Sequence, residues 1–374
     1  MQFRVRVLPV AAVCALTAGM GHPAFDVLPG MPPVLDAHNL YSADGAGMLS
    51  ATVRNDPARV YVPNSKSDTV DVIDPATFKI VDHFALPKHR KGLLEPQHVV
   101  PSWDLKTLWV AQDLGDQLTL IDPATGKAGE TIHVDDPYNM YYTPDGKYAI
   151  VMAEREKRID FHDASDMKKV VNRVPVNCEG VNHADFTIDG RYMIATCEFS
   201  SEIIKVDVAA QKVLAHLKLE PKGMPQDCRI SPDGKVFYIA NMDANGVHLV
   251  DGEVLKQIGF IPTGKGAHGL YFSRDAKTLY ISNRGEGSVS LLDLNSRKLT
   301  AKWKIPGGGS PDMGGVTPDG KQLWLSGRYN SEVYVFDTAN GQLRARIKVG
   351  QGPHGMCVWP QPGRYSLGHT GNMR

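Results

Sequence analysis

The chain has 374 residues, and its 41 Lys and Arg balance 41 Asp and Glu to give a formal net charge of zero. Nucleic-acid-binding proteins normally carry a basic excess, so this balance argues against nucleic acid as a partner. A hydrophobic fraction of 42% is sufficient for a packed core, and the 36 Gly and 25 Pro fit many short strands joined by tight turns.

The N-terminal residues place Arg4 and Arg6 before an apolar run. Such a segment is typical of a secretory signal peptide, and it is too short to cross a bilayer comfortably. We therefore predict a signal peptide over 1–22, a secreted or periplasmic location and no membrane span. The alternative is an apolar start in a cytoplasmic protein. Residues 23–56 are expected to form an extension ahead of the folded domain.

One pattern recurs seven times along the chain. Each copy has a β-rich run, a polar turn, a second β-rich run and a terminal Asp, and a further β-rich run follows it. Most copies are preceded by a short strand that ends in a turn of the Pro-Asp-Gly type, which suits a tight hairpin. Four strands per repeat predict the blades of a β-propeller. The copies are VYVPNSKSDTVDVID, LWVAQDLGDQLTLID, AIVMAEREKRIDFHD, MIATCEFSSEIIKVD, FYIANMDANGVHLVD, LYISNRGEGSVSLLD and LWLSGRYNSEVYVFD.

The two ends of this array complement each other. The first copy, at 59–87, has no inner strand before it, and the segment 355–359 is an inner strand with no outer strands after it. Pairing the two completes seven four-stranded blades and leaves no orphan edge in that blade. The sequence therefore predicts an all-β, seven-bladed propeller over 57–360, closed by its C-terminal strand, with 361–374 as a tail.

The repeats resemble those of the YVTN β-propeller proteins over roughly 57–360. The closing stretch WPQPGRYSLGHTG resembles a bacterial subgroup often labelled YncE-like. More distantly, the repeat is similar to the propellers of dissimilatory nitrite reductase and nitrous oxide reductase. The resemblance implies the fold. It does not specify a function, because these propellers serve as scaffolds, ligand-binding proteins and enzymes.

Aligning the repeats places a polar residue at the start of every inner strand. In a propeller these positions surround the central channel, so the seven side chains should meet at one mouth. Four imidazoles and two carboxylates suit a copper, iron or zinc ion, which makes the histidines candidate metal ligands. Alternatively, each side chain holds the backbone of the neighbouring blade by hydrogen bonds. The series is His98, Asn139, His183, Asp227, His268, Asp312 and His354.

The turns after the second strands should open on the same face as these strand starts. Three of them carry an arginine, and the fixed positive charge would suit a carboxylate or phosphate ligand. The alternative is that the arginines pair with Glu154, Glu198 and Glu286 as solvated ion pairs. The candidate ligand-binding residues are therefore Asn139, Asp227, Asp312, Arg155, Arg284, Arg328, Glu198 and Tyr329.

Four cysteines follow the N-terminal segment. Cys178 and Cys197 flank His183 in one repeat and should lie toward the same face. A disulfide is the leading interpretation for an exported protein, and thiolate ligation beside His183 is the alternative. Cys228 and Cys357 lie within inner strands and are expected to be buried, small apolar residues.

The sequence identifies no catalytic residue, since no Walker loop, GxSxG elbow, HExxH or CxxCH motif occurs in a usable context. Two functions are consistent with it. One is an exported binding protein that holds a small molecule, a metal ion or another protein at the His/Asp-lined mouth. The other is a metal-dependent redox enzyme whose histidines bind copper or iron. His38 and His369 lie outside the repeats, and the pattern does not place them.

Overall fold

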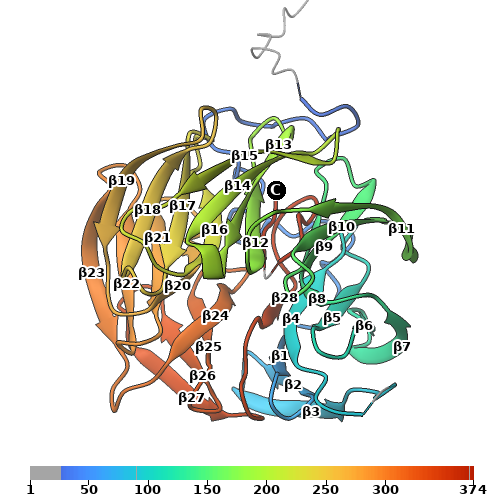
Figure 1. The fold of residues 1–374 in the computed structure, drawn as a ribbon. Coiled ribbons are helices and arrows are strands. Elements are labelled where there is room, and N and C mark those ends of the chain that lie inside the picture. Colours follow the sequence, from blue (N-terminus) through green and yellow to red (C-terminus); the bar gives the residue numbers. More distant parts are fainter. Residues whose placement is uncertain (1–26, 90, 370) are drawn as a thin grey trace, which may run out of the picture.

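Seven four-stranded antiparallel sheets stand as blades around a central channel, which confirms the predicted fold class (Figure 1). This computed structural model describes residues 27–89, 91–369 and 371–374. The predicted signal peptide over 1–22 lies outside the described residues. Within the described part of the chain, no helix has the length and apolar character needed to cross a membrane.

Each blade contributes an inner strand, two middle strands and an outer strand. The inner strands are β28 (Cys357–Trp359), β4 (Pro96–Pro101), β8 (Pro137–Tyr142), β12 (Val181–Phe186), β16 (Pro225–Ile230), β20 (Ala267–Phe272) and β24 (Pro311–Val316). The second strands are β1 (Arg59–Asn64), β5 (Leu108–Gln112), β9 (Tyr148–Ala153), β13 (Tyr192–Cys197), β17 (Val236–Asn241), β21 (Thr278–Asn283) and β25 (Gln322–Gly327). The third strands are β2 (Thr69–Asp74), β6 (Gln117–Asp122), β10 (Arg158–Asp163), β14 (Glu202–Asp207), β18 (Gly246–Asp251), β22 (Ser288–Asp293) and β26 (Glu332–Asp337). The outer strands are β3 (Lys79–Ala85), β7 (Lys127–His133), β11 (Asp166–Pro175), β15 (Lys212–Lys218), β19 (Lys256–Pro262), β23 (Lys298–Lys304) and β27 (Leu343–Lys348). A single turn of 3-10 helix, η1 (Glu198–Ser200), follows β13.

The C-terminal strand closes the circle as predicted. Strand β28 pairs antiparallel with β1, so that Trp359 lies opposite Arg59 and Cys357 lies opposite Tyr61. The Trp359 ring is buried, and its indole nitrogen donates a hydrogen bond of 2.9 Å to a carboxylate oxygen of Asp56. Residues from the two ends of the array therefore share one sheet and leave no free edge between the first and last blades.

Burial decreases from the channel outward. Six of the seven inner strands are buried at every position, whereas the outer strand β15 alternates between exposed and half-buried residues. Apolar side chains of neighbouring blades pack together, as the period-2 pattern predicts.

The aspartate that ends each third strand caps the following turn, for example by accepting the Ala76 amide on Asp74 at 2.9 Å. Five of the seven outer strands begin with lysine, a residue that discourages edge-to-edge pairing.

The N-terminal extension runs across the end of the propeller that carries the Pro-Asp-Gly turns. The amides of Leu28, Leu40 and Gly47 donate hydrogen bonds of 2.8 Å to the carbonyls of Asp189, Pro232 and Pro318, one from each of three blades. This end of the channel is thus covered by a segment outside the repeats. The opposite end, where the inner strands begin, is the predicted mouth.

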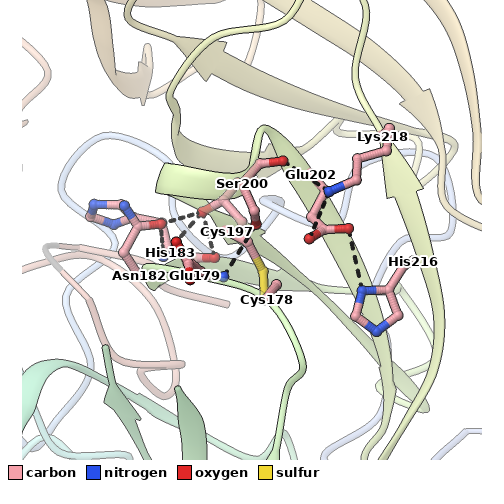
Figure 2. Close-up of a disulfide and its surroundings, with 10 residues drawn as sticks. Cys178, Glu179, Asn182, His183, Cys197, Ser200, Glu202, His216 and Lys218 are labelled. Carbon is pink, nitrogen blue, oxygen red and sulfur yellow. Dashed lines mark hydrogen bonds and ion pairs between the residues drawn. A yellow bond between two sulfur atoms is a disulfide. The ribbon is translucent and has the colours of Figure 1, made fainter. Parts of the chain in front are cut away.

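A disulfide joins Cys178 to Cys197 with an S–S distance of 2.05 Å (Figure 2). It links the loop before β12 to the end of β13 and therefore lies at the mouth end of its blade. His183 and Asn182 lie beside it in Figure 2. Because both sulfur atoms are joined to each other, thiolate ligation beside His183 does not describe this arrangement. Cys228 and Cys357 are free and buried, as expected.

The disulfide should make a measurable contribution to stability. Closing a loop of 19 residues restricts the unfolded chain, which corresponds to about 3 kcal/mol in the chain-entropy model. We expect a Cys178→Ser/Cys197→Ser double variant to lose about that much free energy of unfolding in urea titrations. The wild type in excess reductant should match the variant. Equal stability of the oxidised wild type and the variant would contradict this expectation.

Candidate functional site

Six of the seven inner strands are irregular at their polar residue. In β4 the pairing with β5 shifts between Pro96 and His98, and in β16 the pairing with β17 shifts between Pro225 and Cys228, on either side of Asp227. Strands β8, β12, β20 and β24 carry the same shift. Such a bulge redirects one side chain away from the regular alternation of the strand. The bulges therefore explain how six repeats direct a polar group toward the channel, while His354 of the seventh lies just before β28. We call His98, Asn139, His183, Asp227, His268, Asp312 and His354 the channel ring.

The four histidines of the channel ring form a closed circuit. Their ring centroids are separated by 5.5 Å between His98 and His183 and by 6.5 Å between His183 and His268. The circuit continues with 6.0 Å between His268 and His354 and 4.9 Å between His354 and His98. All four side chains are buried, with an exposure of 2% or less. The structure thus brings the four imidazoles of the predicted column together.

The C-terminal tail adds a fifth histidine to the circuit. The tail turns into the channel from the covered end, and Figure 1 places the C-terminus in the middle of the ring of blades. The Tyr142 amide donates to the carbonyl of Leu367 at 2.9 Å, and the His369 amide donates to the carbonyl of Met140 at 2.8 Å. The His369 ring consequently lies 4.9 Å from that of His183 and 5.4 Å from that of His98.

Two groups of three potential ligands result. The first triad is His98, His183 and His369, and the second triad is His268, Asp312 and His354. Within each triad, one ligand atom per residue lies within 4.8 Å of the others. A metal ion bound by imidazole nitrogens and carboxylate oxygens at about 2.0–2.2 Å needs ligand atoms this close together. Both triads are fully buried, so water competes little with their side chains.

Four of the five histidines have a ring nitrogen that no hydrogen bond uses. His98 donates from Nδ1 to the carbonyl of Tyr138 at 2.9 Å, which leaves Nε2 with its lone pair. Within the described part of the chain, the Nε2 atoms of His98 and His183 and the Nδ1 atoms of His268 and His354 have no hydrogen-bond partner. Buried polar atoms are rarely left in this state, and convergence on a common centre explains it.

Burial also keeps the imidazoles neutral. It lowers the pKa of His98 to about 3 and that of His268 to about 4. For the same reason the pKa values of His183, His354 and His369 lie well below the ordinary value. A neutral imidazole retains the lone pair that metal coordination requires.

Asn139 connects the two sides of the first triad. Its Nδ2 lies 3.1 Å from Nδ1 of His183 and 3.0 Å from Nδ1 of His369, while its Oδ1 accepts the Met140 amide at 2.8 Å. The same Nδ2 also lies 3.3 Å from the carbonyl of Asn182. Two amide hydrogens cannot serve all of these acceptors at once. Asn139 therefore positions both His183 and His369, but its two amide hydrogens do not fix which ring nitrogen is protonated in each of them.

The two aspartates of the channel ring have different roles. Asp227 accepts the amides of Cys228 and Leu270, each at 2.9 Å, and so holds the next blade as the structural alternative predicts. Burial raises its pKa to about 6, although Arg229 acts in the opposite direction. Both oxygens of Asp312, by contrast, have no directed hydrogen bond in the described part of the chain.

Asp312 nevertheless lies among positive and polarisable groups. One of its oxygens is 3.0 Å from Nδ1 of His268 and 3.2 Å from Nε of Arg284, and the other is 3.5 Å from Nε2 of His354. Burial by itself would raise the pKa of Asp312. Arg284 and the two histidines outweigh that effect and hold the pKa well below its ordinary value. Asp312 is thus a carboxylate that faces two imidazoles.

The predicted arginines of the mouth do not behave alike. Arg284 reaches Asp312, and it also donates to the hydroxyl of Tyr329 at 3.0 Å. Arg328 donates to Oγ of Ser65 at 2.9 Å, and its charge contributes to the low pKa of His354. These two cations therefore lie at the channel ring.

Arg155 requires a correction. It binds the carboxylates of Asp113, Asp116 and Asp136 at 2.8–3.1 Å and does not pair with a glutamate of the turns. Its charge is consequently neutralised in the second blade, and it is not available to a ligand. The predicted glutamate partners lie elsewhere, since Glu198 accepts from Asn182 and Glu286 pairs with Lys302.

One aromatic ring that the sequence analysis did not select covers the imidazoles. The ring centroid of Tyr138 lies 5.3 Å from His98, 6.1 Å from His183 and 6.3 Å from His354. The buried carboxyls of Glu154 and Glu198 act on its pKa together with Arg284 and Arg328, so all of them lie near the Tyr138 hydroxyl. Burial raises the pKa of both glutamates. Tyr138 precedes the ring residue Asn139 directly, and this position was the available sequence signal.

A family model for YNCE-like β-propellers matches residues 30–363 of this chain. The chain belongs to the YNCE-like β-propeller family. The matched region contains the whole channel ring and ends before His369, so the fifth imidazole of this YNCE-like propeller comes from beyond the family match.

Curated relatives are more distant. The chain is 27% identical to antigen Lp49 of Leptospira interrogans over 167 residues, which cover 38% of this chain and 36% of that protein. It is 23% identical to hydrazine synthase subunit beta of Kuenenia stuttgartiensis over 248 residues, 59% of each chain. The chain thus spans well under two thirds of the curated relatives that it matches.

Solved structures share the architecture. Hydrazine synthase of Kuenenia stuttgartiensis aligns with a TM-score of 0.63 and 19% identity, over 78% of this YNCE-like chain and 97% of the other. Dihydro-heme d1 dehydrogenase NirN, solved in complex with DHE, aligns with a TM-score of 0.60 and 16% identity, over 83% and 77%. At such identities the likeness concerns the fold.

Proposed function

We propose that this YNCE-like propeller is an exported binding protein that holds a transition-metal ion in its channel. The observation that carries the proposal is the meeting of five buried imidazoles, of which His98, His183, His268 and His354 each have a ring nitrogen without a hydrogen-bond partner in the described part of the chain. Imidazole-rich sites suit copper, zinc and iron. The first triad supplies three neutral nitrogens, and a set of three protein ligands leaves one position open for water or a small molecule.

Metal analysis tests this proposal directly. The purified full chain is stripped with chelator, loaded separately with Cu²⁺, Zn²⁺ and Fe²⁺, and freed of excess metal before elemental analysis. We expect stoichiometric retention of at least one of these ions, and its loss in His183→Ala. The matched control is His248→Ala, because His248 in β18 is also fully buried but contacts Asn241 of β17. Protein that stays metal-free with all three ions would refute the proposal.

Export is a separate part of the proposal. The Cys178–Cys197 disulfide supports it, because disulfides persist chiefly in oxidising compartments. N-terminal sequencing of native protein checks it. A mature start near residue 23 is expected, and an intact Met1 would count against export.

A metal-dependent redox enzyme is the second candidate function. Tyr138 and the two buried glutamates favour it, because they place groups able to carry protons near the imidazoles. Two of the relatives are named as a synthase and a dehydrogenase. A redox titration of copper- or iron-loaded protein distinguishes the candidates. Reversible cycling of the bound metal favours the enzyme, and a metal held in one oxidation state favours the binding protein.

A further inference from the structure

We propose that the channel holds two metal ions, one in each triad, so that the binding site is a two-metal centre. This inference rests on the proposed metal binding and goes further, since a single ion would satisfy that function. The structure brings the six residues together as two groups of three and not as one group of six. One ion with metal–ligand distances of about 2.0–2.2 Å therefore cannot use both groups in this arrangement.

The second triad has the composition of a metal site in its own right. Two imidazoles and one carboxylate form a set that binds zinc and leaves an open position. The carboxylate oxygens of Asp312 and the Nδ1 atoms of His268 and His354 are buried, and none has a hydrogen-bond partner in the described part of the chain. A carboxylate oxygen 3.0 Å from an imidazole nitrogen without an aligned hydrogen bond indicates two groups directed at a third point.

Arg284 does not remove the need for such a partner. Its Nε lies 3.2 Å from Asp312, but that nitrogen too lacks a directed hydrogen bond among the described residues. The guanidinium instead donates from Nη1 to the hydroxyl of exposed Tyr329. Arg284 thus supplies charge beside the second triad, while the lone pairs of Asp312 remain available for coordination.

The two triads are built from separate parts of the chain. The first requires His369 from the tail together with β4 and β12, whereas the second uses β20, β24 and the segment before β28. They meet where the His98 and His354 rings lie 4.9 Å apart. Single substitutions can therefore remove one site and leave the ligands of the other in place, which makes the count of metal ions testable.

The experiment counts Zn²⁺ per chain by elemental analysis and native mass spectrometry of the full-length protein. The variants are His369→Ala for the first site, His268→Ala for the second site, and both together. We expect two ions in the wild type, one in each single variant and none in the double variant. His248→Ala, the buried control, should retain two. Asp312→Asn replaces His268→Ala if that variant does not fold by circular dichroism.

Three outcomes overturn the inference. One ion in the wild type that is lost in both single variants would mean one shared site, and one ion lost only in His369→Ala would mean that the second triad binds none. Both results leave the proposed metal binding standing. A wild type without metal would refute that function as well. Cu²⁺ loading gives a second readout, because two neighbouring Cu²⁺ ions couple magnetically in the wild type, whereas each single variant should show an isolated ion.

Discussion

Replacing Arg374 with methionine is expected to lower the free energy of unfolding by about 3–5 kcal/mol, because it leaves a buried carboxylate without its cation. The guanidinium of Arg374 donates to Asp185 at 2.6 Å, and the carboxylate of Asp185 is fully buried. Methionine retains most of the apolar length of the arginine side chain. The loss of stability in this variant is therefore caused by the unpaired charge of Asp185 and not by a cavity.

Urea unfolding monitored by circular dichroism measures this effect. The matched control is Arg344→Met, because Arg344 lies on an outer strand with half of its side chain exposed, 3.7 Å from Asp337. That variant should change stability by no more than about 0.5 kcal/mol. An Arg374→Met/Asp185→Asn double variant should recover part of the loss. Equal effects of the two single arginine variants would show that the tail does not depend on this ion pair.

The fold could be predicted because each repeat encodes its own hairpins. Strand alternation, the Pro-Asp-Gly turns and the aspartate after each third strand are local signals, and seven copies reinforce one another. The closure of β28 on β1 followed from counting strands, since one end lacked what the other supplied. The channel ring could be predicted by the same logic, because one aligned column becomes one circle in space.

The tail could not be predicted, since it belongs to no repeat. His369 meets His98 and His183 across long stretches of sequence, and no periodic position relates them. Tyr365 and Leu367 of this segment are buried against the propeller. Burial of apolar side chains inserts the tail, and this insertion sets the place of the fifth imidazole.

The partners of the mouth arginines were missed for a related reason. Arg155 pairs with Asp113, 42 residues earlier, which is about one repeat. Contacts between neighbouring blades have this separation, whereas the glutamates of the turns were the expected partners. Charged side chains in adjacent blades at the same height are thus the better candidates for ion pairs in such a fold.

Metal loading is expected to stabilise the protein through the tail. An ion that binds the folded chain alone at about 1,000 times its dissociation constant contributes about 4 kcal/mol to the free energy of unfolding. Because His369 is one of the proposed ligands, part of this effect should appear as slower hydrogen exchange of tail amides. The amide of His369, which donates to Met140, is a suitable probe.

The comparison between two histidine variants decides whether the tail is responsible. His369→Gln keeps a polar side chain in the channel, and we expect it to lose most of the metal-dependent increase in melting temperature and tail protection. His216→Gln is the control, because His216 lies beside Glu202, as Figure 2 shows, on the outer strand β15 of the blade whose inner strand carries His183, so that two strands separate it from the channel. Its response to metal should equal that of the wild type, and chelator should reverse both. An undiminished response in His369→Gln would mean that the metal is held by the blades alone, so that the tail fills the channel without taking part in coordination.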